Sequence, residues 1–149
     1  MAFQITGVHH IGLTVRDITR SFAWYQKMFD LVPGAVNRGS GPALSEALQV
    51  EGAELSFSML SIGGTRIEFL QYHSPEGKDF DRTNGDVGST HICLQVPSMD
   101  VAFADLTAKG AVFNAPPITL TDGDLVGSKW AYFRDPDGIQ LEIWESPVA

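Results

Sequence analysis

The sequence predicts an α+β protein built from two repeated units, each with a strand, a helix and then several strands. Two observations lead to this prediction. The segment HHIGLTV at His9 returns as THICLQV at Thr90, and GTRIEFLQ at Gly64 returns as GIQLEIWE at Gly138. The first pair of segments is offset by 81 residues and the second by 74, so the first copy is seven residues longer in its middle. Self-similarity at this distance indicates two structural units within the 149 residues.

The first unit is predicted to open with a strand and a helix. Residues 9–15 alternate in polarity and contain several branched side chains, which is typical of a strand. Asp17 is placed to cap a helix whose apolar residues recur at steps of three and four as far as Phe29. We expect Pro33-Gly34 to end this helix. Further strands are predicted around residues 43–50, 55–61 and 66–72.

The second unit repeats this order. Residues 91–96 are predicted to form a strand, and Ser98 is placed to cap a helix that stops at Gly110. Two stretches have no periodicity: residues 74–88, predicted to be the linker between the units, and residues 115–127, predicted to be a mobile loop. Strands are also expected near residues 112–113, 129–134 and 140–144.

Four side chains with metal-binding chemistry occupy matching places in the two units. Side chains alternate across a sheet, so the face opposite the helix-covering apolar residues carries His10, Glu68, His91 and Glu142. Two curved sheets joined along these faces would form a cleft in which unpaired carboxylates are costly. A divalent cation would balance two carboxylates, and imidazole with carboxylate suits first-row metals. We therefore predict a four-ligand metal site.

The repeated HxxLxV openings and the ending DPDGIQLEIWE from Asp135 resemble the vicinal oxygen chelate superfamily, which includes the glyoxalase and bleomycin-resistance proteins. The pattern is most similar to glyoxalase I and methylmalonyl-CoA epimerase. The resemblance implies one domain over residues 1–149, made of two βαβββ modules at about 5–73 and about 88–146, whose curved mixed sheets form an open barrel-like cleft. It also implies that the same four residues bind one divalent ion of zinc, cobalt, nickel, manganese or iron. Family members pair modules within a chain or across a dimer, and we expect a homodimer.

The ligand set constrains the chemistry. Four protein ligands saturate a tetrahedral ion, whereas a five- or six-coordinate ion keeps positions for water or substrate. Such an ion can polarise a carbonyl and stabilise an enolate. Glu142 and Glu68 are the candidate catalytic bases, because a carboxylate displaced from the metal in a dry pocket gains basicity. The resemblance implies an isomerase, epimerase or lyase acting on a small oxo-acid, hemithioacetal or acyl-CoA.

Three alternatives remain. An extradiol-type Fe(II) dioxygenase uses two histidines and one carboxylate, so Glu68 argues against it. A thiol transferase of the fosfomycin-resistance kind needs a cationic arrangement that is not recognisable in this sequence. A metal-free binding or resistance protein is expected to have lost the ligands that this chain retains.

Composition limits the partners. The net charge of −8 and the absence of Lys/Arg clusters argue against nucleic acid and anionic membranes as partners. No apolar run approaches the ~18 residues of a membrane span, and a single cysteine fits a reducing compartment. We therefore expect a cytoplasmic enzyme with a small-molecule substrate.

The remaining polar residues receive simpler interpretations. His9 and His73 are expected to be structural, and Cys93 is expected to line the cavity beside His91. Arg66 is the arginine best placed for an anionic substrate, because it shares a strand face with Glu68.

Overall fold

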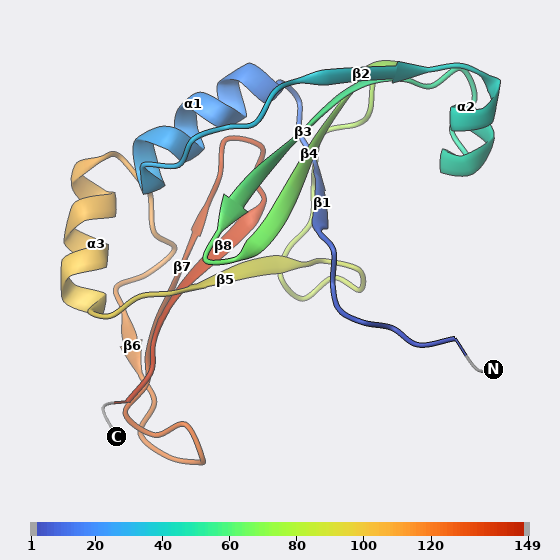
Figure 1. The fold of residues 1–149 in the computed structure, drawn as a ribbon. Coiled ribbons are helices and arrows are strands. Elements are labelled where there is room, and N and C mark those ends of the chain that lie inside the picture. Colours follow the sequence, from blue (N-terminus) through green and yellow to red (C-terminus); the bar gives the residue numbers. More distant parts are fainter. Residues whose placement is uncertain (1–2, 148–149) are drawn as a thin grey trace. The chain divides into compact units, whose positions relative to one another are not determined.

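The computed structural model describes residues 3–147 as strands, helices and connecting loops (Figure 1). The chain divides into two compact units, one extending to Asp79 and the other beginning at Phe80. Each unit contains one four-stranded mixed sheet, which confirms the predicted fold class. Residues 1–2 and 148–149, the ends of the predicted domain range, lie outside the described residues. Within the described part of the chain, none of the helices has the length and apolar character needed to cross a membrane.

The sheet of the first unit has the strand order β1-β4-β3-β2. Strands β1 and β4 are parallel, whereas β4 with β3 and β3 with β2 are antiparallel. The register places Gly12 beside Glu68. The elements of this unit are β1 (Ile11–Thr14), α1 (Ile18–Phe29), β2 (Asn37–Ser40), α2 (Pro42–Leu48), β3 (Glu54–Ile62) and β4 (Thr65–Ser74).

Helix α1 packs against one face of β3 and β4. The Asp17 carboxylate accepts a hydrogen bond from the Arg20 backbone N–H at 2.9 Å, which confirms the predicted cap. The rings of Phe22 and Tyr25 meet the fully buried Phe69 edge to face, with centroids 5.3 Å and 4.9 Å away. These contacts define the helix-covered face of the first sheet.

The helix ends earlier than Pro33-Gly34 predicted. Asp30 adopts the left-handed conformation at φ 54° and its backbone N–H bonds to the Gln26 carbonyl, which closes the last turn. The chain therefore leaves the helix before the proline can act as a stop signal.

The strand predicted at residues 43–50 is wrong, because this segment forms helix α2. Pro42 occupies the first turn, where its missing N–H costs no intrahelical hydrogen bond, and good helix formers follow it. The strand of this region is β2, which pairs with β3 from Asn37↔Phe57 to Ser40↔Glu54. A seven-residue segment with alternating small and large side chains fits a strand as well as a short helix. The pairing of β2 with β3 decides between these two structures.

The sheet of the second unit has the corresponding order β5-β8-β7-β6, with β5 and β8 parallel. The strand predicted at residues 112–113 is reduced to an isolated bridge between Phe113 and Phe133. A two-residue strand lies instead inside the predicted loop, where Ile118 pairs with Trp130. The elements are β5 (His91–Gln95), α3 (Met99–Ala108), β6 (Ile118–Thr119), β7 (Lys129–Arg134) and β8 (Gln140–Glu145).

Helix α3 is held by its cap and by an aromatic cluster. The Ser98 hydroxyl accepts from the Val101 N–H at 3.4 Å, as predicted for the cap. Ring centroids are 4.4 Å apart for Phe103 and Phe113, and 4.9 Å apart for Phe113 and the fully buried Phe133. Phe133 therefore marks the helix-covered face of the second sheet.

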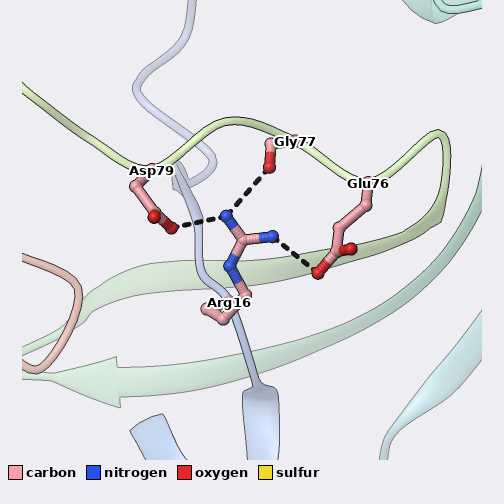
Figure 2. A network of polar contacts seen from close by, with 4 residues as sticks. All are labelled: Arg16, Glu76, Gly77 and Asp79. Carbon is pink, nitrogen blue, oxygen red and sulfur yellow. Dashed lines mark hydrogen bonds and ion pairs between the residues drawn. The ribbon is translucent and has the colours of Figure 1, made fainter.

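Arg16 ties the segment after β4 to the end of β1 (Figure 2). Its guanidinium donates to the Glu76 carboxylate and the Gly77 carbonyl, each at 2.8 Å, and to the Asp79 carboxylate at 2.6 Å. The hydrogen bond that Arg16 donates to the Asp79 carboxylate is the main cause that raises the pKa of the Arg16 side chain. The first part of the predicted linker is thus fixed to the first unit.

Candidate functional site

The first unit brings His10 and Glu68 together. His10 directly precedes β1, and Glu68 lies on β4, the parallel neighbour of β1. His10 Nε2 is 3.3 Å from the Glu68 carboxylate, and the two side chains are 36% and 18% exposed. Since Phe69 faces α1, the alternation along β4 turns Glu68 to the opposite face.

The second unit contains the matching pair, His91 on β5 and Glu142 on β8. His91 Nε2 is 3.2 Å from the Glu142 carboxylate, and the Glu142 side chain is only 8% exposed. Phe133 and Leu141 are both fully buried and pair across β7 and β8, so Glu142 again lies on the face away from the helix. Each predicted histidine therefore contacts the predicted glutamate of its own unit.

Two neutral donors surround Glu142. Cys93 on β5 and Tyr132 on β7 lie beside Glu142 in the strand register, and each presents a group that can donate to its carboxylate. Desolvation, with the nearby Glu142 carboxylate, raises the pKa of Cys93 to about 12 and the pKa of Tyr132 to about 12. Tyr132 Oη is also 3.4 Å from His91 Nε2. Both groups therefore stay protonated at neutral pH and act as donors.

The surroundings of Glu68 are different. The positions that correspond to Cys93 and Tyr132 hold Gly12 and Met59, neither of which has a hydroxyl or thiol to donate. Glu68 thus contacts His10, whereas Glu142 contacts His91 and also has Cys93 and Tyr132 beside it. The two glutamates have equivalent backbone positions and different neighbours.

Sequence reasoning missed Tyr132 and the contacts of His9. Tyr132 could have been found from strand alternation, since it lies between the apolar Ala131 and Phe133 on β7 and so faces away from the buried side. His9 was expected to be structural, but its Nδ1 lies 2.8 Å from His10 Nδ1, and its Nε2 lies 3.0 Å from Arg66 Nη1. No strand pattern could indicate this contact, because residues 9 and 10 precede β1.

Two other polar groups have simple roles. His73 Nε2 is 2.8 Å from the hydroxyl of the buried Ser56, which agrees with a structural role. Lys129 Nζ pairs with the Glu145 carboxylate at 3.6 Å, and Glu145 also accepts from the Met99 backbone N–H at the start of α3.

The donor geometry of each pair fits a first-row divalent ion. Two donors about 2.1 Å from one ion, with the 3.2–3.3 Å separation observed here, would subtend roughly 100°, between the tetrahedral and octahedral angles. Among residues 3–147, no group of three or more His, Cys, Asp or Glu side chains is arranged to hold a metal ion. Each unit by itself therefore offers two ligands.

The fold and the two pairs define a protein with duplicated mixed-sheet units and one imidazole–carboxylate pair in each. The chain belongs to the Glyoxalase/Bleomycin resistance protein/Dioxygenase superfamily, whose model matches residues 7–143. This match confirms the resemblance to the vicinal oxygen chelate proteins.

Sequence relatives agree with this family, and a solved structure shares the fold. The chain is 30% identical over 146 residues to a 2-epi-5-epi-valiolone epimerase from Actinomyces sp, covering 95% of this chain and 80% of that protein. It is 26% identical over 118 residues to the mitochondrial methylmalonyl-CoA epimerase of Homo sapiens, covering 71% of this chain and 59% of that protein. The fold matches a glyoxalase family protein from Bacillus cereus with a TM-score of 0.79 and 15% identity, covering 98% and 97% of the two chains.

Proposed function

We propose that this protein is a divalent-metal-dependent epimerase that exchanges the proton on a carbon next to a carbonyl group. The observation that supports this most directly is the His–Glu pair repeated in both units at 3.3 Å and 3.2 Å. Isomerase, epimerase and lyase reactions are all expected from the sequence, and the resemblance to two epimerases favours epimerisation among them.

The proposed ligands of one divalent ion are the two pairs, His10 with Glu68 and His91 with Glu142. Two neutral imidazoles and two carboxylates balance the charge of the ion, so no buried net charge remains. The ion would act as a Lewis acid that polarises the substrate carbonyl and so acidifies the adjacent carbon. Zinc, cobalt, nickel, manganese and iron all suit these donors. One chain or two chains of a dimer can contribute the pairs.

Epimerisation needs one group to remove a proton and a second group to return a proton to the opposite face of the carbon. We assign these roles to Glu68 and Glu142, one from each unit. Glu68 is the better candidate for the carboxylate that leaves its ligand position, since the contact recorded for it within residues 3–147 is with His10. Glu142 also lies beside Cys93 and Tyr132, so it is expected to leave its ligand position less readily than Glu68.

Metal analysis is the first experiment. In the parent protein we expect about one ion for each set of four ligands, that is, for two His–Glu pairs. We expect loss of that ion in the His10→Ala and Glu142→Ala variants. Substitution of the exposed Glu51 by Gln is the matched control and should leave the metal content unchanged. A parent protein that stays metal-free under every loading condition would overturn the proposal.

The second experiment measures proton exchange. The metal-loaded protein is incubated in D₂O with the compounds named for its relatives, 2-epi-5-epi-valiolone and methylmalonyl-CoA, and with simpler 2-oxo acids. We expect deuterium at the carbon beside the carbonyl in at least one substrate, and loss of this exchange in Glu68→Gln protein that still binds metal. Oxygen consumption with a catechol, retained in Glu68→Gln, would favour a ring-cleaving dioxygenase instead.

A further inference from the structure

A continuous series of polar contacts crosses one face of the first unit. Arg66 Nη1 is 3.0 Å from His9 Nε2, and His9 Nδ1 is 2.8 Å from His10 Nδ1. His10 Nε2 in turn is 3.3 Å from the Glu68 carboxylate. The proposed ligand His10 is therefore connected through His9 to an exposed arginine.

The direction of these hydrogen bonds follows from the chemistry of the guanidinium. Arginine can only donate, so His9 Nε2 must accept from Arg66. A neutral imidazole has one N–H, which in His9 is then on Nδ1 and donates to His10 Nδ1. The proton of His10 is consequently on Nε2, facing Glu68. All donors then point from Arg66 towards the carboxylate.

Metal binding by His10 is incompatible with hydrogen bonds that run in this direction, from Arg66 towards Glu68. A ligating nitrogen uses its lone pair and carries no proton, so the N–H of His10 must move to Nδ1. Ligating histidines generally donate this second N–H to a partner, and here the partner is His9 Nδ1. The proton of His9 then lies on Nε2, where it faces the N–H of Arg66, and two donors cannot bond to each other.

The contact between Arg66 and His9 is the one expected to break. The Arg66 side chain is exposed, so water can replace His9 at little cost. The contact between His9 and His10 fixes the ring orientation of a ligand, and loss of such support typically weakens metal binding.

A released Arg66 is well placed for a substrate. It lies two residues before Glu68 on β4 and so shares its face, about 7 Å away along the strand. A free guanidinium binds carboxylate and phosphate groups through paired hydrogen bonds. The corresponding position in the second unit is the uncharged Gln140, which is 3% exposed, and Thr90 replaces His9. The series of contacts from Arg66 through His9 to His10 is therefore a feature of the first unit and is not repeated in the second.

We propose that His9 is a positioning residue that couples His10 to Arg66, so that a bound divalent ion releases Arg66 to hold a carboxylate or phosphate group of the substrate. The proposal rests on the proposed function, because it requires His10 to be a metal ligand.

The test compares the chemical accessibility of Arg66 with and without metal. Chelator-treated and cobalt-loaded protein are labelled with 4-hydroxyphenylglyoxal, and the labelled arginine peptides are quantified by mass spectrometry. Loading should accelerate labelling of Arg66 about two- to tenfold, the range expected for loss of one exposed hydrogen bond. Arg38, an exposed arginine on β2, is the internal control and should be unchanged.

The His9→Phe variant keeps a flat ring without nitrogen. In this variant Arg66 should react at the fast rate with or without cobalt, and cobalt affinity measured by calorimetry should fall about tenfold or more. Inorganic phosphate, used as the anion probe on metal-free His9→Phe protein, should slow labelling of Arg66 more than that of Arg38. The comparison in the parent protein does not depend on how well this variant folds.

Each contrary result has a separate meaning. Cobalt binding by the parent with unchanged labelling of Arg66 would overturn the coupling and leave the proposed function standing. Absence of cobalt binding by the parent would overturn both. Equal protection of Arg66 and Arg38 by phosphate would overturn the assignment of Arg66 as an anion-binding residue.

Discussion

The thiol of Cys93 provides a quantitative test of the surroundings of Glu142. Desolvation and the Glu142 carboxylate raise the pKa of this thiol from 9.0 to about 12. At pH 8 the reactive thiolate fraction therefore falls roughly 1000-fold, whereas the higher basicity makes each thiolate about 15- to 30-fold more nucleophilic. The net expectation is that folded protein reacts roughly 30- to 60-fold more slowly than the unfolded chain.

The assay uses the neutral reagent 2,2′-dithiodipyridine on chelator-treated protein, since Cys93 is the single cysteine of the chain. Because its pKa is raised, thiolate appears at higher pH, and the rate should keep rising between pH 9 and about pH 11 instead of levelling near 9. The protein unfolded in urea supplies the reference rate at each pH.

The perturbation is Glu142→Gln, which removes the negative charge beside the thiol. This variant should react faster than the parent but more slowly than unfolded protein, because desolvation remains and is the largest cause of the shift. Glu51→Gln, the same change at an exposed site, is the control. Unfolded-like reactivity of the folded parent, or no effect of Glu142→Gln, would refute the reasoning.

Three further predictions concern stability and metal binding. Phe133→Ala, at a fully buried ring, should lower the free energy of unfolding in urea by about 3–5 kcal/mol, and a loss below 1 kcal/mol would contradict its place in the core. Asp17→Ala removes the cap on Arg20 and should cost about 0.5–2 kcal/mol in the same assay, whereas no change would show that the cap contributes nothing. Tyr132→Phe removes a donor to Glu142 and should weaken calorimetric metal affinity about tenfold or more; unchanged affinity would count against Tyr132 as a supporting residue.

Much of the fold follows from local patterns. The alternation in β4 and β8 requires Glu68 and Glu142 to lie opposite the buried residues, which is the face that the sequence predicts for both. The four-ligand metal site remains a prediction. Helix α2 was mistaken for a strand, because a seven-residue segment is too short for its periodicity to separate the two structures.

Contacts between strands depend on register, which the sequence does not display. Tyr132 reaches Glu142 because β7 pairs with β8 in one particular alignment, and a shift by one residue would turn the ring to the other face. The strand β6 is likewise defined by its pairing with β7, through Ile118 with Trp130 and Thr119 with Lys129.

The sequence by itself determined the duplication, the order of the main strands and helices, and the faces of β4 and β8 on which Glu68 and Glu142 lie, since these depend on repeats and on side-chain alternation within single strands. Only the tertiary structure decided that Cys93 and Tyr132 lie beside Glu142 where Gly12 and Met59 lie beside Glu68, and that His9 connects His10 to Arg66. The physical reason is that a hydrogen bond between side chains on separate segments forms only when the distance is right to within a few tenths of an ångström. Strand register and the path of irregular backbone set that distance.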